Sequence, residues 1–212
     1  MTKVRSYPQR VRENILPLSV ASTLPEAFEE WSFTETIEDH EEPIEKCQLC
    51  EKEQLRYHFE IRNAITNNAL WVGSQCILKF GLSVFEDGIK LTQKQAQNKL
   101  DRLVQKMRLD SCIKALKRLA SAEDNEILDN ALAYYEENKF LTPKQAFVVL
   151  WRLQQNKIDH SPSFFKVSLK KQKYRDDLED MSTNRVHVIW PSLTSSQRRM
   201  AMELGHAAPN ST

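Results

Sequence analysis

Three of the four cysteines in this 212-residue chain lie between residues 45 and 80, and their spacing is typical of metal ligands. Cys47 and Cys50 form a C-x-x-C pair, and Cys76 follows two apolar segments later. Two thiolates separated by two residues can bind one tetrahedral ion from a tight turn, and a third can reach the same ion from a helix start. The pattern predicts a zinc site at Cys47, Cys50 and Cys76.

A closed structural zinc site needs four ligands, so one position remains to be filled. We predict that His58, the nearest histidine after Cys50, fills it, with His40 and Cys112 as alternatives. Cys112 lies on the apolar face of a predicted helix and is expected to be a core thiol. Four protein ligands leave no position for water, so the zinc is expected to be structural.

The segments around the cysteines must bring them together, and their patterns predict a hairpin followed by a helix. Apolar and polar residues alternate over 55–61, which is typical of a half-buried strand, and 69–72 reads as the returning strand. Ser74 is then the expected cap of a helix whose first turn carries Cys76. The positive end of that helix should stabilise a thiolate at Cys76.

Two other interpretations of the C-x-x-C pair remain open at this point. The pair could be a redox centre, or the cysteines could be ordinary buried thiols. A thioredoxin-like redox centre needs a strand and a helix in a set order around the pair, and the sequence does not show that order. A 24.7 kDa chain also does not need disulfides to fold, so clustered cysteines favour metal.

Residues 45–80 resemble a small treble-clef-like zinc-binding module found in bacterial, phage and large-DNA-virus proteins of mostly unassigned function. The matching positions are Cys47, Cys50, Asn63, Val72, Gly73, Ser74, Cys76, Ile77, Lys79 and Phe80. Members often carry Gly or Gly-His after the second cysteine, where this chain has Glu51 and Lys52. The resemblance implies metal binding and an origin in phage or other mobile elements, and it implies no particular activity.

Helix signals dominate the later part of the chain. Only four glycines occur in the sequence, a composition that favours helices. Three predicted helix starts share a capping box, in which a Thr side chain accepts a backbone N–H three residues on and a Gln reaches back; they begin at Thr92, Thr142 and Thr194. Residues 91–105 and 141–155 also match in register, which indicates shared capping chemistry, the interpretation we favour, or a duplication.

Further helices are predicted at 110–121, at 124–138 and from Phe164 to Met181, followed by an extended link at 185–193. The predicted fold class is α+β: a hairpin-containing zinc module with a mostly helical remainder. We divide the chain into a partly ordered N-terminal arm (1–43), a zinc-binding module (44–90), a helical bundle (91–160) and a C-terminal helical segment with a disordered tail (161–212).

Charge is distributed unevenly and indicates a polyanion as one class of partner. Residues 26–53 hold eleven Asp and Glu against two Lys, whereas 90–175 hold eighteen Lys and Arg against nine Asp and Glu. Basic helices can neutralise phosphates, and Phe164, Phe165 and Tyr174 could stack on bases. The predicted nucleic-acid contacts are Lys99, Arg102, Lys106, Lys114, Lys117, Arg118, Lys166, Lys170, Lys171, Lys173 and Arg175.

The leading hypothesis is therefore a non-enzymatic, zinc-stabilised nucleic-acid-binding or regulatory protein. The alternative is an adaptor or inhibitor that binds a protein through its acidic arm and through exposed aromatic side chains, with Trp31, Trp151 and Trp190 as candidates. No phosphate loop or hydrolase motif occurs and no small-molecule substrate is evident. A nuclease would need acidic residues such as those at 39–42 or 176–180 to hold Mg²⁺. No stretch predicts a signal peptide or membrane span, so we expect a cytoplasmic protein.

Overall fold

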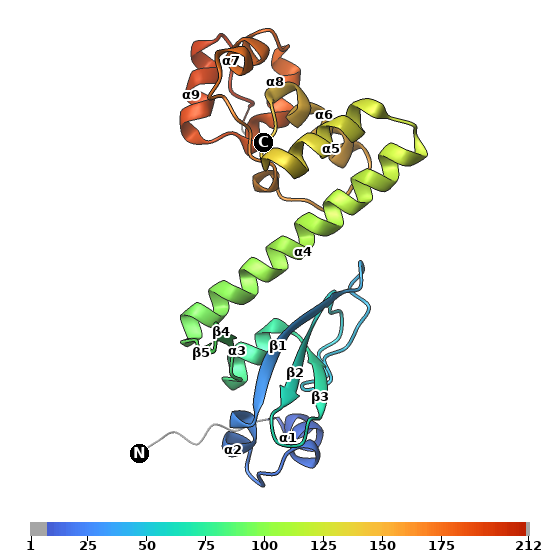
Figure 1. Ribbon diagram of the computed structural model, residues 1–212, viewed down its shortest axis with the longest axis vertical. Helices are drawn as coiled ribbons and strands as arrows, with labels where there is room; N and C mark the ends of the chain where they lie inside the picture. The colour runs from blue at the N-terminus through green and yellow to red at the C-terminus, as the bar shows by residue number, and fades with distance from the viewer. Residues whose placement is uncertain (1–7, 211–212) are drawn as a thin grey trace. The chain divides into compact units, whose positions relative to one another are not determined.

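A computed structural model describes residues 8–210 and confirms the α+β class (Figure 1). The chain forms two compact units, the first ending at Met107 and the second beginning at Arg108. The helix α4, Gln93–Ala122, contributes to both units. None of the helices in the described part of the chain is long and apolar enough to cross a membrane.

The first unit is built on a three-stranded antiparallel sheet with the order β1-β2-β3, and these strands lie side by side in Figure 1. Its elements are α1 (Gln9–Ile15), the 3-10 turn η1 (Leu16–Leu18), α2 (Leu24–Glu29), β1 (Trp31–Asp39), β2 (Tyr57–Asn63), β3 (Ala69–Val72), α3 (Ser74–Phe80), β4 (Phe85–Glu86) and β5 (Ile89–Lys90).

The predicted hairpin is confirmed, and its alternation explains the core of the first unit. Phe59 pairs with Val72 across β2 and β3, and Ile61 pairs with both Leu70 and Phe33 of β1. All five side chains are buried, so this face of the sheet excludes water. The predicted Ser74 cap is wrong, because Gly73 occupies the cap position of α3 and no side chain caps it.

Residues 8–43 are far more ordered than the predicted arm. Trp31 and Phe33 alternate with polar residues along β1, and Trp31 is fully buried with its Nε1–H donating to Ser19 Oγ at 2.9 Å. The acidic residues between Glu35 and Asp39 concealed this strand, because its partner β2 lies more than a dozen residues later in the sequence. The predicted arm residues 1–7 lie outside the described range.

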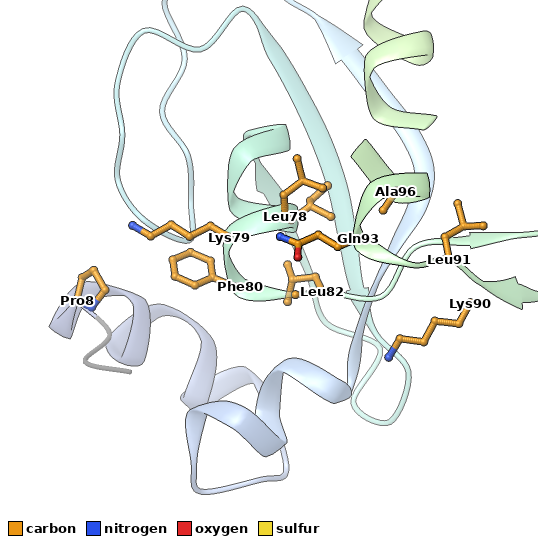
Figure 2. Close-up of a pocket in the computed structure, with 11 residues that line it drawn as sticks. Pro8, Leu78, Lys79, Phe80, Leu82, Lys90, Leu91, Gln93 and Ala96 are labelled. Atoms are coloured by element: carbon orange, nitrogen blue, oxygen red, sulfur yellow. The ribbon is translucent and has the colours of Figure 1, made fainter. Parts of the chain in front are cut away.

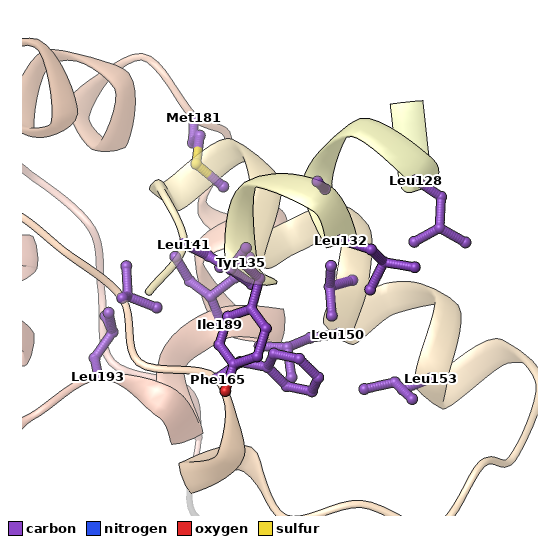
Figure 3. Packing of buried hydrophobic residues seen from close by; sticks show 14 of the residues in the cluster. Leu128, Leu132, Tyr135, Leu141, Leu150, Leu153, Phe165, Met181, Ile189 and Leu193 are labelled. Atoms are coloured by element: carbon purple, nitrogen blue, oxygen red, sulfur yellow. The ribbon is translucent and has the colours of Figure 1, made fainter. Parts of the chain in front are cut away.

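The second unit consists of short helices around one apolar core. Its elements, besides the end of α4, are α5 (Glu126–Asn138), α6 (Pro143–Gln155), the 3-10 turn η2 (Pro162–Phe164), α7 (Gln172–Glu179), α8 (Thr183–Ile189), the 3-10 turn η3 (Trp190–Ser192) and α9 (Ser195–Glu203). Figure 3 shows Phe165 and Tyr135 at the centre of this core, with ring centroids 5.0 Å apart, beside Leu150.

All three predicted capping boxes are confirmed. Thr142 Oγ1 accepts from the Gln145 N–H at 3.4 Å, and the Thr142 N–H donates to Gln145 Oε1 at 3.1 Å. The same reciprocal bonds join Thr92 to Gln95 and Thr194 to Gln197.

The two helices that were predicted to begin near Leu91 and at Asp110 form one continuous helix, α4.

The C-terminal segment departs from the prediction in three places. Residues 165–169 are extended and bond to Leu141, whose N–H donates to the Lys166 carbonyl at 2.8 Å, so the predicted helix begins only at Gln172. Residues 183–189 form α8, because Val186 and Ile189 lie three residues apart and pack into the core as one helical face. His206 is buried and bonds the Leu178 carbonyl, so the predicted disordered tail is ordered there; residues 211–212 lie outside the described range.

Candidate metal centre

The C-x-x-C pair lies in a tight turn that the backbone closes on itself. The Cys47 N–H donates to the Lys52 carbonyl and the Glu51 N–H donates to the Cys47 carbonyl, both at 2.9 Å. Glu51 has a φ of 61°, in the left-handed region that favours glycine. The flanking residues Glu45 and Leu55 exchange two backbone hydrogen bonds, which extend the turn into a short ladder.

Gln48 attaches this turn to the exposed edge of β3. Its N–H donates to the Trp71 carbonyl at 2.9 Å, while its side-chain Oε1 accepts the Trp71 N–H at 2.8 Å. Two bonds to one residue fix the position of the turn relative to the strand. Since β3 ends at Val72 and leads directly into α3, the turn is held beside the start of that helix.

Cys76, the third residue of α3, completes the cluster. Its Sγ lies 3.6 Å from Cys47 Sγ and 3.1 Å from Cys50 Sγ, and the three sulfurs lie within 4.8 Å of one another. A Cβ at Gly73 would lie 3.2 Å from Leu55 Cδ1, so the absence of a side chain there lets the chain approach closely. The turn, β3 and the helix start therefore bring together three thiols separated in sequence.

The donor set fits a metal ion. Three thiolates at the usual Zn–S length of about 2.3 Å in a tetrahedron lie roughly 3.8 Å apart, close to the spacing of the cluster. Cys47 and Cys76 are buried and Cys50 is half-buried. The three cysteines could hold a metal ion, and within residues 8–210 they form the one such group of three or more His, Cys, Asp and Glu side chains.

The three cysteines also shift one another's pKa values. The hydrogen bond between the Cys47 and Cys76 sulfurs lowers the pKa of Cys47 to about 5, against burial, which acts in the opposite direction. The same bond, together with burial, raises the pKa of Cys76 well above its usual range. Among the three thiols, the first thiolate is thus favoured at Cys47.

The structure does not bring His58 into the cluster. His58 is buried on β2, its Nδ1 lies 3.2 Å from His40 Nε2, and its ring stacks on Trp71. Burial, more than the neighbouring His40, lowers the pKa of His58 below its usual 6.5. Cys112 lies in the core of the second unit, where burial raises its pKa to about 12.

The predicted nucleic-acid contacts in the first unit do not form one basic surface. Lys99 is buried, forms an ion pair with Glu35 and donates to the Phe85 carbonyl at 2.6 Å, so its charge is used inside the protein. Arg102 forms an ion pair with Glu86 at 3.0 Å, and Lys106 is exposed. The sequence did not reveal this ion pair, because Glu35, the partner of Lys99, lies 64 residues away in the chain.

A basic cleft of about 740 Å³ lies in the second unit, between the end of α4 and α5. Three predicted residues line it, Lys114, Lys117 and Arg118, and the sequence analysis missed the fourth, Lys139. Lys117 also forms an ion pair with Glu136 at 2.7 Å. Lys139 escaped notice because it follows the last turn of α5 in a left-handed conformation, outside any helical stripe.

The basic segment 166–175 is only partly available to a ligand. Lys166, Lys170, Lys171 and Lys173 are exposed. Arg175 instead donates to the carbonyls of Leu169 and Lys170 and holds the loop before α7. Phe165 and Tyr174 are buried, so these two rings do not offer the predicted stacking surface.

One predicted tryptophan reaches the surface. Trp31 is buried, which removes it as a contact for a partner, and Trp190 is half-buried. Trp151 is 38% exposed on α6 and stacks on Phe147, with the Arg152 guanidinium 5.1 Å from its ring centroid.

An apolar groove of about 760 Å³ in the first unit was not predicted. Phe80, Leu82 and Gln93 lie between Lys79 on one side and Lys90 on the other (Figure 2). The groove is assembled from α3, the β5 region and the start of α4, so no single sequence segment reveals it.

The acidic residues considered for a nuclease form no group of three among residues 8–210 that could hold a metal ion. Asp39 binds Arg56 through both carboxylate oxygens, and Asp177 forms an ion pair with Lys144 at 2.6 Å.

Comparison of the chain with known protein families, with curated proteins and with solved structures found no match in any of the three.

Proposed function

We propose that this protein is a non-enzymatic, zinc-stabilised binding protein whose second unit contacts nucleic acid. The observation that carries the metal part is the convergence of the Cys47, Cys50 and Cys76 sulfurs within 4.8 Å of one another from two separate segments. Thiolate ligands select zinc among the common divalent ions of cells. The ion would join the turn at 47–50 to α3 and so stabilise the first unit.

The nucleic-acid part rests on unpaired positive charge in the second unit. Lys114 and Lys139 line the basic cleft, and neither forms an ion pair among the described residues. The exposed lysines of the 166–173 segment add charge on the same unit. Lysines in such a cleft neutralise phosphates without reading the sequence, so the expected binding is electrostatic and depends strongly on salt.

One surface supports a protein partner as the second candidate. The exposed Trp151 stacks on the half-buried Phe147, with the Arg185 guanidinium 5.1 Å from the Phe147 ring centroid. Exposed tryptophan and arginine side chains contribute much of the binding energy at protein interfaces. Under this alternative, Trp151→Ala weakens binding to the partner and the basic cleft is irrelevant.

Metal analysis tests the first part of the proposal. We expect one zinc per purified wild-type chain, loss of tight zinc binding in Cys76→Ser, and full zinc in Cys112→Ser, which is the matched control because Cys112 lies in the core of the second unit. A stably folded wild-type chain that takes up no zinc would refute the metal site.

Binding to single- and double-stranded DNA and RNA, measured against salt, tests the second part. The double variant Lys114→Gln/Lys139→Gln should reduce the slope of log affinity against log salt by about 1 to 2, because each phosphate contact contributes roughly 0.7 to 0.9. Lys157→Gln is the control, since Lys157 is exposed on the same unit but outside the cleft. Absence of binding even at low salt would exclude this function.

A further inference from the structure

The cysteine cluster provides three ligands, and no fourth of the usual types lies with them. The group includes no His, Asp or Glu side chain from residues 8–210. Residues 1–7 (MTKVRSY) and 211–212 (ST) contain none of these side chains and no cysteine. A tetrahedral ion at Cys47, Cys50 and Cys76 therefore has one position that this group does not fill.

A cavity of about 470 Å³ adjoins the cluster, and all three cysteines form part of its wall. The remaining wall comes from the segment 52–56, from the strand β2, from residues 73–75 and from one face of α4 within the first unit. Such a volume is within the usual range for a bound small molecule. The three cysteines, of which Cys50 is half-buried, thus border a space that a ligand could enter.

The chemistry of the wall indicates what that ligand would be. Lys52 is exposed on the wall and forms no ion pair among the described residues, while Gln54, Gln75 and Gln105 offer amide groups. Zinc bound by three thiolates carries a net charge of about −1, and sulfur is a preferred fourth donor for it. A compact thiol with carboxylate or amide groups would match the ion through its sulfur and the wall through its polar groups.

We propose that the metal ion at Cys47, Cys50 and Cys76 binds a low-molecular-weight thiol from this cavity as its fourth ligand. This rests on the metal part of the proposed function. On binding, the thiol releases its proton to solvent, its sulfur forms a bond to the ion, and the water that held the position leaves; no oxidation or reduction occurs. The first unit would then bind a thiol through its metal, without a chemical reaction on that thiol.

Cobalt substitution tests this inference in the full-length protein. Metal content is measured first: a chain that binds neither Zn²⁺ nor Co²⁺ would refute the proposed metal site itself. In the Co²⁺-loaded protein we then titrate glutathione and follow the sulfur-to-cobalt absorption. The intensity should saturate at about one third above its starting value, because a fourth thiolate joins three. S-methylglutathione, which lacks the free thiol, is the matched control and should produce no change.

Two variants identify a protein ligand if there is one. Asp101 lines the same cavity and His58 is the histidine that the sequence predicted, so we expect Asp101→Asn and His58→Gln to leave both the thiol-free spectrum and the glutathione response unchanged. A changed thiol-free spectrum in either variant would assign the fourth position to that residue and overturn the inference. So would a cobalt spectrum that glutathione leaves unaltered, or loss of the cobalt from the protein on adding it.

Discussion

Replacing Lys99 by methionine should weaken the first unit and leave nucleic-acid binding intact. The Lys99 side chain is 9% exposed and its Nζ donates to the Phe85 carbonyl, whereas the carboxylate of its partner Glu35 is on a side chain that is 61% exposed. Glu35 can return to water, so the ion pair contributes at most about 1 kcal/mol. A hydrogen bond from a charged donor contributes roughly 1.5 to 3 kcal/mol. Methionine keeps the apolar stem, and we expect a net loss of about 1 to 3 kcal/mol, since removing a buried charge offsets part of the cost.

Urea denaturation measures this loss. A background of Trp151→Phe and Trp190→Phe leaves Trp31 and Trp71 as reporters of the first unit. Lys106→Met, an exposed position on the same helix, is the control and should change the free energy of unfolding by less than about 0.5 kcal/mol. If Lys99→Met instead kept the stability and lowered the salt slope of nucleic-acid binding, Lys99 would be a phosphate contact and the structural explanation would fail.

Four further changes probe other features of the fold. Burial lowers the pKa of His58 below 6.5, so the unfolded chain binds a proton at this imidazole more readily than the folded chain. The free energy of unfolding should therefore fall as the pH falls below about 6.5. In urea titrations at several pH values, His58→Gln should reduce the slope of this free energy against pH. Thr142→Ala removes a capping box and should cost about 1 kcal/mol in the unfolding of the second unit. Glu51→Gly relieves a left-handed φ and should raise the free energy of unfolding of the zinc-loaded protein by up to about 1 kcal/mol, seen as a higher thermal midpoint. Chelation of zinc should expose the amides of β2, β3 and α3 to hydrogen exchange while those of α5 and α6 stay protected.

Local patterns predicted what depends on neighbouring residues. The hairpin, the start of α3 and the three capping boxes each need only side chains within a few positions of one another. The cysteine cluster was predictable from its spacing, since C-x-x-C specifies a turn and a helix start can return Cys76 to it. The bonds between Gln48 and Trp71 that hold this turn join residues 23 positions apart, and the sequence did not predict them.

Distant partners explain what the sequence did not reveal. The acidic composition of residues 35–42 indicated a partly ordered arm, but pairing with β2 buries Trp31 and Phe33 at the start of β1. His58 occupies a polar position of an alternating strand, yet His40, which follows β1, and Trp71 of β3 pack against its ring. The packing of neighbouring segments sets the exposure of a side chain, and the alternation of apolar and polar residues along one strand does not predict it.

The two halves of the proposed function depend on different units, so each can be tested without the other. The three clustered cysteines precede Met107, whereas the basic cleft belongs entirely to the unit that follows it. The core of the second unit holds Cys112 among apolar side chains and needs no metal to exclude water. Zinc would therefore act on nucleic-acid affinity only through changes in the first unit, and a Cys76→Ser chain that still binds nucleic acid with the wild-type salt slope would place recognition wholly in the helical unit.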